Sequence, residues 1–201
     1  TKDLLEAMDA MSLKCAQELS DAHVDVMGYA CLVAIMSMGR GYHCVSEVNL
    51  HQETVSNDFP TPIVTSAGAL INGLKVLGAK QISIITPYMR PLTDMVVDYI
   101  ENQGIKVKQS IALEIPDNLE VAAQNPMNLL EIYKQLDLTD VDVLVASACV
   151  QMPSLEAIDL IQAECGIPVT SAAVCTTYEM MKKLNIEPKS AIGGELLSGK
   201  Y

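Results

Sequence analysis

The feature that most constrains this chain is a repeated unit around two of its six cysteines. Residues 24–33 read VDVMGYACLV and residues 141–150 read VDVLVASACV, and each unit is followed later by a second similar segment, PIVTSA at 62–67 and PVTSA at 168–172. An apolar run without alternation is typical of a buried parallel strand. Cys31 and Cys149 then lie at the carboxyl ends of such strands, where open α/β sheets bind ligands. The repeat therefore predicts two similar lobes that face each other across one cleft, with a thiol on each wall.

Strand and helix signals alternate through the rest of the chain. This alternation predicts an α/β fold in which parallel sheets are flanked by helices. Residues 39–59 look irregular and polar, Pro126 should kink or break a helix over 119–136, and residues 186–192 add a final short piece. The other expected strands are 62–65, 81–86, 105–112 and 168–170, and the other expected helices are 1–20, 66–77, 91–103, 153–164 and 173–184.

The repeat also suggests how the chain divides. We expect residues 1–65 together with about 171–201 to form the first lobe, and residues 66–170 to form the second. A pseudo-twofold axis would relate the lobes, with the active site between them. Because no strand precedes the first expected helix, we also expect that a native N-terminal strand is missing from the sequence as given.

Charge and cysteine usage exclude several classes of function. A net charge of −12 argues against nucleic acid as a partner, because nucleic-acid binding depends on Lys and Arg. No uninterrupted apolar stretch is long enough to cross a membrane, so we expect a cytoplasmic protein with reduced thiols. The cysteines lack Cys-x-x-Cys spacing, the histidines are scattered and no glycine-rich phosphate loop occurs. These patterns predict neither a metal nor a cofactor.

Most of the cysteines need no functional interpretation, because cysteine often serves as a small buried hydrophobe. Cys15, Cys165 and Cys175 fit that description, and Cys44 lies in the region expected to be irregular. Cys31 and Cys149 differ because they occupy the same place in two equivalent units. A thiol at a strand end next to a helix N-terminus also loses its proton more readily.

Two further residues follow expected strands. Tyr88 comes after the strand 81–86, so its hydroxyl is placed to donate to a ligand, although a packed surface tyrosine is the alternative. Asn118 follows the next strand and precedes a helix, and helix capping alone would explain it. The hydroxyls at 65–66 and 170–171 are interpreted as helix caps.

Four short motifs together resemble one family of enzymes. The motifs are YACLV at 29–33, TPY at 86–88, PDN at 116–118 and ACV at 148–150. They look like the maleate cis-trans isomerases of the aspartate/glutamate racemase superfamily, and the resemblance covers essentially the whole chain. Arylmalonate decarboxylases are also similar but keep only the second cysteine. Amino-acid racemases usually show Asn-Thr and Thr-His after the two cysteines, where this chain has Leu-Val and Val-Gln.

The resemblance implies a role for each matching residue. Cys31 corresponds to the nucleophile, Cys149 to its acid/base partner, and Tyr88 and Asn118 to substrate-contacting residues. It also implies maleate as the substrate, no cofactor and a bacterial catabolic role. We expect a homodimer because related two-lobed folds often pair through exposed helices. The family uses an additional Asn after its first strand, and this position is not found here.

The chemistry of the reaction explains why two thiols are needed. Maleate becomes fumarate only if its double bond is temporarily lost, which addition of the Cys31 thiolate and protonation from Cys149 would achieve. Backbone N–H groups at Leu32, Val33 and Val150 are expected to hold the carboxylates. Two alternatives remain open. One is an amino-acid racemase whose two thiols act on opposite faces of Cα, and the other is a non-catalytic carboxylate-binding protein.

Overall fold

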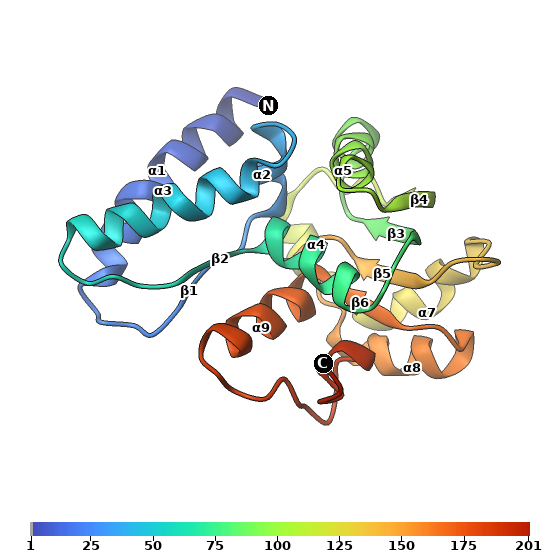
Figure 1. The fold of residues 1–201 in the computed structure, drawn as a ribbon. Helices are drawn as coiled ribbons and strands as arrows, with labels where there is room; N and C mark the ends of the chain where they lie inside the picture. The colour runs from blue at the N-terminus through green and yellow to red at the C-terminus, as the bar shows by residue number, and fades with distance from the viewer. Residues whose placement is uncertain (1) are drawn as a thin grey trace.

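The strands form two parallel sheets (Figure 1), as the sequence predicts. The structure is a computed structural model that describes residues 2–201. One sheet has two strands in the order β1-β2, and the other has four in the order β4-β3-β5-β6. The strands are β1 (Met27–Tyr29), β2 (Ile63–Thr65), β3 (Gln81–Thr86), β4 (Lys106–Ala112), β5 (Val143–Ser147) and β6 (Val169–Ser171).

The centre of the four-stranded sheet is the core of the molecule. Every residue of β5 is buried, and so are five of the six residues of β3. Helices cover both faces of a parallel sheet, so its inner strands carry continuous apolar runs. This explains why the apolar run at 141–150 identified a strand correctly.

Helices connect the strands at nearly all the expected positions. Three of them end before a glycine with positive φ: Gly78 (73°), Gly104 (82°) and Gly166 (73°). The helices are α1 (Lys2–Ser20), α2 (Leu32–Ser37), α3 (Tyr42–Ser56), α4 (Ser66–Val76), α5 (Arg90–Asn102), α6 (Asn118–Ala122), α7 (Leu129–Ile132), α8 (Leu155–Cys165) and α9 (Ala172–Lys183), with 3-10 turns η1 (Pro126–Asn128), η2 (Tyr133–Gln135) and η3 (Glu195–Leu197). Residue 1, where the first helix was expected to begin, lies outside the described residues.

The expectation of an irregular region at 39–59 is wrong, because α3 occupies most of it. This helix has an inverted pattern of polarity. Its buried side chains include the polar His43, Ser46 and Thr54, whereas Val45 and Val48 are exposed. A helix that buries polar side chains shows no apolar stripe, which is the signal that identifies a helix in a sequence.

Two other expectations concern the later part of the chain. The helix expected over 119–136 is broken as predicted, since Pro126 begins the 3-10 turn between α6 and α7. Within 186–192 the regular structure among the described residues is one antiparallel bridge from Lys189 to Ser198.

The division into lobes stays a prediction. Helices α1 and α3 lie side by side next to the two-stranded sheet (Figure 1). Helix α9, which the predicted boundary assigns to the first lobe, packs against α4 and contacts strands of both sheets, β2 and β6. The final strand before it, β6, pairs with β5 of the larger sheet.

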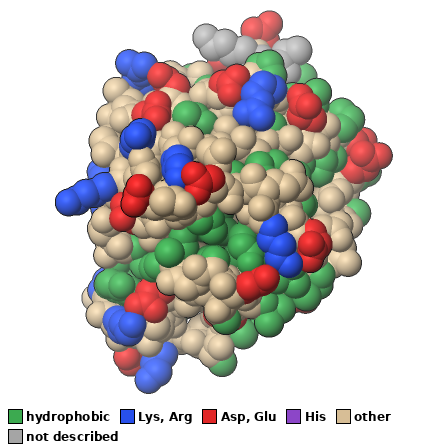
Figure 2. Space-filling model, turned by 90° about the vertical axis from the view of Figure 1, so that its right-hand side faces the viewer, with side chains coloured by type: hydrophobic (Ala, Val, Ile, Leu, Met, Phe, Trp, Pro, Cys, Tyr) green, Lys and Arg blue, Asp and Glu red, His purple; other side chains and the backbone are tan. Residues whose placement is uncertain are grey.

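The surface carries charges of both signs. Figure 2 shows acidic and basic side chains interspersed over one face, with hydrophobic side chains gathered in a hollow near its centre. Among the described residues, no helix is long and apolar enough to span a membrane.

Candidate active site

Cys31 lies between the first strand and a short helix. Strand β1 ends at Tyr29, and Cys31 is the N-cap residue of α2 with extended backbone angles (φ −121°, ψ 93°). Burial raises the pKa of the Cys31 thiol, and the charge of Cys149 raises it further, whereas the N–H groups of Ala34 and Val33 lower it. The side chain makes no capping hydrogen bond of ordinary geometry, so these N–H groups act on the sulfur mainly as dipoles.

Cys149 follows its strand at the same spacing but in a different environment. Strand β5 ends at Ser147, again two residues before the cysteine, and Cys149 is buried. The Ser147 hydroxyl donates to the carbonyl of Cys149 at 2.8 Å and lies 3.5 Å from the carbonyl of Met152. These contacts stabilise the turn that follows Cys149. The expected helix N-terminus beside this thiol is absent, since α8 begins only at Leu155. The two units are therefore equivalent at the strand but not after it.

Tyr88 interacts with both cysteines. Its side chain is half-buried, and its hydroxyl donates to the carbonyl of Ala148 at 3.2 Å. Burial raises the pKa of Tyr88 well above its ordinary value, and the charge of Cys149, a hydrogen bond with Cys149 and the charge of Cys31 raise it further. The hydroxyl is thus enclosed beside the thiols rather than packed along the surface.

These interactions bring together three of the residues predicted from the sequence. Cys31 comes from the two-stranded sheet, whereas Tyr88 and Cys149 follow β3 and β5, which are neighbours in the four-stranded sheet. Since parallel strands present their carboxyl ends at one edge, Tyr88 and Cys149 emerge side by side. The site therefore joins two sheets, with two thiols and one phenol that can exchange protons or attack an electrophile.

Asn118 is connected to this site through its backbone. It is exposed at the start of α6, and its carbonyl accepts a hydrogen bond from the Gln151 side chain at 2.7 Å. The capping explanation for Asn118 is wrong, because the cap is Asp117, whose carboxylate accepts from the N–H groups of Leu119 and Glu120. Gln151 connects the loop after β4 to the turn after Cys149. Its position two residues beyond Cys149 is the sequence signal that could have identified it as a residue near the site.

The three N–H groups proposed as carboxylate ligands flank the thiols. Leu32 and Val33 begin α2, so their N–H groups have no acceptor within the helix. The Leu32 side chain is buried, whereas those of Val33 and Val150 are half-buried. Their role toward a substrate stays a prediction.

The other cysteines and the histidines lie elsewhere. All six cysteines are free thiols; Cys15 and Cys44 are exposed, and Cys175 is buried against the Thr170 hydroxyl at 3.3 Å. His43 is buried and contacts Tyr99 on α5. Among the described residues, no group of three or more His, Cys, Asp and Glu side chains is arranged to hold a metal ion.

Comparisons with known proteins identify relatives along the whole chain. The family model described as arylmalonate decarboxylase matches residues 6–197. A maleate isomerase of Geobacillus stearothermophilus is 55% identical over 100% of this chain and 80% of its own length. A maleate isomerase of Pseudomonas putida is 56% identical with the same coverage.

Solved structures share the fold closely. A maleate isomerase from Pseudomonas putida, crystallised as a cysteine-to-alanine variant with maleate, superposes with a TM-score of 0.98 at 57% identity, covering 100% of this chain and 80% of its own. A Nocardia farcinica maleate cis-trans isomerase, a cysteine-to-serine mutant with a covalently bound succinylcysteine intermediate, gives 0.93 at 38% identity, covering 98% and 80%.

Arylmalonate decarboxylase itself shares the fold, with a TM-score of 0.79 at 16% identity over 96% of this chain and 83% of its own. The similarity in sequence is much greater to the isomerases, and it extends from one end of the chain to the other. The chain belongs to the maleate isomerase family, within the larger group that the arylmalonate decarboxylase model describes.

Proposed function

We propose that this chain converts maleate to fumarate without a cofactor, with Cys31 as the nucleophile and Cys149 as the acid/base partner. The observation that carries the proposal is the interaction of Cys31 with Cys149 and of Tyr88 with both. The relatives that share the sequence along its whole length are maleate isomerases. The Nocardia relative with a succinylcysteine intermediate supports a covalent route through cysteine.

The environments of the two thiols support this assignment of roles. Burial raises the pKa of Cys31, and the N–H groups of Ala34 and Val33 offset part of that rise, which helps to stabilise the thiolate that a nucleophile requires. Cys149 begins a turn rather than a helix, and hydrogen bonds of Ser147 hold that turn. Cys149 is therefore placed as a fixed donor and acceptor of a proton.

The reaction then proceeds in two reversible stages. The Cys31 thiolate forms a C–S bond to one alkene carbon, and the displaced π electrons move toward the carboxylate conjugated with the other carbon. Cys149 gives its proton to that carbon, which leaves a succinyl thioether with a C–C single bond free to rotate. After rotation Cys149 takes the same proton back, the C–S bond breaks, and fumarate leaves with Cys31 again a thiolate.

Substrate binding depends mainly on uncharged donors in this proposal. Both arginines are engaged on the surface: Arg40 pairs with Asp98, and Arg90 contacts Ser110 and Asp94. We therefore assign the carboxylates to backbone N–H groups at Leu32, Val33 and Val150 and to the side chains of Tyr88 and Asn118. Such dipoles also stabilise the charge that develops on addition.

Incubation with maleate tests the proposal directly. Proton NMR should show fumarate accumulating, whereas L-aspartate in a parallel sample should keep its optical activity. Loss of optical activity would instead support the racemase alternative. Saturable binding of maleate without turnover would support the carboxylate-binding alternative.

We also propose a cytoplasmic homodimer that acts on small dicarboxylates in a bacterial catabolic pathway. Six free thiols suit a reducing compartment. Most soluble oligomers are symmetric homo-oligomers, and dimers are the commonest of them.

A further inference from the structure

A buried hydrogen-bonded pair connects α3 to α5. His43, in the first turn of α3, is buried, and Tyr99 on α5 is 1% exposed. The Nδ1 atom of His43 lies 2.5 Å from the Tyr99 hydroxyl oxygen, and that oxygen also accepts from the backbone N–H of His43 at 3.1 Å. Two hydrogen bonds therefore join one residue pair across the two helices.

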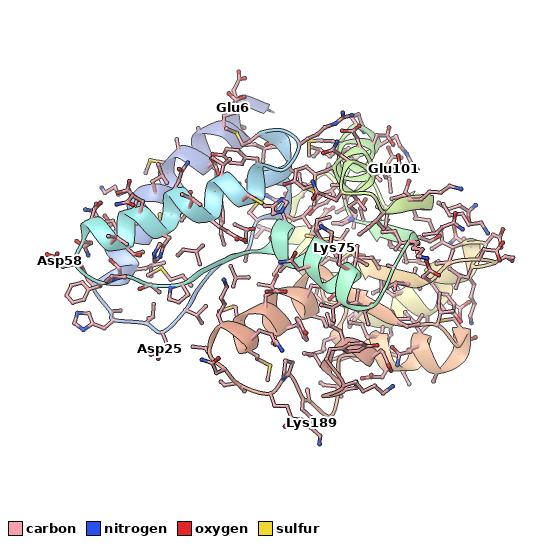
Figure 3. All side chains as sticks on the ribbon, viewed as in Figure 1. Glu6, Asp25, Asp58, Lys75, Glu101 and Lys189 are labelled. Atoms are coloured by element: carbon pink, nitrogen blue, oxygen red, sulfur yellow. The ribbon has the colours of Figure 1, made fainter. Side chains whose placement is uncertain are left out.

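The Tyr99 hydroxyl takes part in both hydrogen bonds of the pair. The Tyr99 oxygen accepts the backbone hydrogen bond of His43 and shares a second hydrogen bond with Nδ1, in which the tautomer of the ring sets which atom donates. Burial lowers the pKa of His43 and keeps the ring neutral; the charge of Glu47 opposes this, and that of Lys75, labelled on α4 in Figure 3, adds to it. The Tyr99 hydroxyl, the Nδ1 atom of His43 and the backbone N–H of His43 are thus all hydrogen-bonded within one pair of residues.

A second contact joins the same parts of the molecule through Asp98, the residue next to Tyr99 on α5. The guanidinium of Arg40, in the turn between α2 and α3, donates from Nε and Nη2 to the two carboxylate oxygens of Asp98. This pair is exposed, so it contributes less than the buried one. Figure 1 shows α2 beside α5, where these contacts lie.

The joined helices, α3 and α5, lie shortly after two of the site residues in the chain. Cys31 is followed directly by the short helix α2 and then by α3, and α5 begins two residues after Tyr88. The first turn of α4 closes over the same region, since a Cβ atom at Gly68 would lie 3.1 Å from the His43 ring. His43 therefore has little room to move away from Tyr99.

We propose that the hydrogen bonds between His43 and Tyr99 are a positioning contact that sets Cys31 at its working distance from Tyr88 and Cys149. The inference rests on the proposed function. Neither residue touches the substrate in this proposal. Their effect is on geometry, and a shift of about 1 Å at a reacting atom can slow a reaction roughly a hundredfold.

Tyr99→Phe tests the proposal, because it removes the hydroxyl and keeps the ring. In a Cys149→Ser background, intact-protein mass spectrometry measures how fast the maleate adduct forms on Cys31. We expect formation to slow about tenfold or more, with maleate affinity changed less than about twofold. Tyr133→Phe is the matched control: this buried tyrosine interacts with Glu164 within the predicted second lobe, and its loss should leave the adduct rate unchanged.

A second readout does not need maleate. Iodoacetamide alkylation of Cys31 followed against pH should show a lower midpoint in Tyr99→Phe, because the thiol would be less buried and farther from Cys149. If Tyr99→Phe lowers thermal stability as Tyr133→Phe does but changes neither adduct rate nor midpoint, the contact is only structural and the proposal is wrong. Absence of an adduct in the Cys149→Ser parent would contradict the proposed function instead, and the alkylation midpoint would still decide the positioning role.

Discussion

At the scale of single residues, the two thiols of the repeat differ more than their sequences suggest. Cys31 is the N-cap of a helix, whereas Cys149 begins a turn whose carbonyl groups are held by the buried Ser147 hydroxyl. Tyr88 interacts with both thiols, so the charge on a thiol affects the pKa of the Tyr88 hydroxyl. The site is asymmetric, as a reaction with one nucleophile and one proton carrier requires.

Removing each thiol should therefore give a different failure. Cys31→Ala lacks the nucleophile, so no adduct should form and turnover should fall to background. Cys149→Ser keeps the nucleophile and should accumulate a mass increase of one substrate on Cys31, detected by intact mass spectrometry and peptide mapping. An adduct on Cys149 in the Cys31→Ala variant would reverse the roles, and near-normal rates in both would exclude the two-thiol mechanism.

The reactivity of Cys31 should depend steeply on pH. Burial and the Cys149 charge raise its pKa, so near neutral pH the thiol form dominates in the free enzyme. Below that pKa, alkylation by iodoacetamide should increase about tenfold for each pH unit, because the thiolate is the reactive form. Cys149→Ala removes the charge of Cys149, one of the two causes that raise the pKa of Cys31. The pKa of Cys31 should therefore fall, and its alkylation at a given pH should become faster.

Cys165 provides the internal control for this measurement. Burial also raises its pKa, but Cys149 is not among the causes. Peptide mapping should therefore show no acceleration at Cys165 in Cys149→Ala. Equal acceleration at both cysteines would indicate general loosening of the protein and contradict the explanation.

Ser147 should matter for both stability and rate. It is fully buried and donates to the Cys149 carbonyl, so Ser147→Ala leaves that acceptor unsatisfied and should cost about 1–3 kcal/mol of unfolding free energy. Turnover should fall as well, because the turn carrying Cys149 is loosened. Ser83 on β3 is equally buried but its hydroxyl has no partner, so Ser83→Ala should not destabilise. Urea unfolding and initial rates of both variants measure these effects.

At the scale of elements, the two Val-Asp-Val segments differ in structure although their sequences are the same. Before β5, the Asp142 carboxylate accepts the N–H groups of Lys80 and Gln81 at 2.8 Å each and so attaches the start of β5 to that of β3. Asp25, its counterpart before β1, is exposed at the edge of the molecule (Figure 3) and makes no side-chain hydrogen bond to any described residue. Strand pairing in the larger sheet thus uses a contact that the smaller sheet lacks.

This difference predicts unequal effects of the same substitution. Asp142→Ala should lower the unfolding free energy by about 1 kcal/mol, whereas Asp25→Ala should change it by less than about 0.5 kcal/mol. The N–H groups of Gln81 and Lys80 lower the pKa of Asp142, so its contribution is present at neutral pH. It should be lost as the pH falls from about 4 through the lowered pKa. Denaturant unfolding across this pH range measures both variants, and equal losses would contradict the attachment.

At the scale of the whole molecule, the site depends on how two sheets meet. Cys31 follows a strand of the smaller sheet, and Tyr88 and Cys149 follow strands of the larger one. No single element holds a complete set of reacting groups. Contacts between α2, α3 and α5 pack the segments after Cys31 and Tyr88 together, so the proposed function predicts that they matter to catalysis.

The proposed dimer is tested at the same scale. Light scattering at micromolar concentration should give twice the 21.7 kDa mass of the chain. A mass of one chain at that concentration would show this expectation to be wrong.

The sequence by itself determined the class of fold and singled out Cys31 and Cys149 as candidate reacting residues. Continuous apolar runs and their spacing identified the strands, because buried parallel strands must be apolar on both faces. The repeat then placed Cys31 and Cys149 at equivalent strand ends, two residues beyond β1 and β5. An apolar run and the residues that follow it lie within one short segment, so each strand and the cysteine after it can be recognised from that segment alone.

Only the tertiary structure decided the features that depend on distant partners. Helix α3 escapes prediction because its buried side chains are mostly polar, and His43 is satisfied by Tyr99, far away in sequence. The choice of Asp117 over Asn118 as a cap, and the enclosure of Tyr88 beside both thiols, depend on backbone geometry and on contacts between sheets. The pattern of polar and apolar residues in a sequence indicates whether a side chain faces the core. It does not indicate which polar partner a buried side chain will contact, because that partner comes from a distant part of the chain, so these features are seen only in the folded molecule.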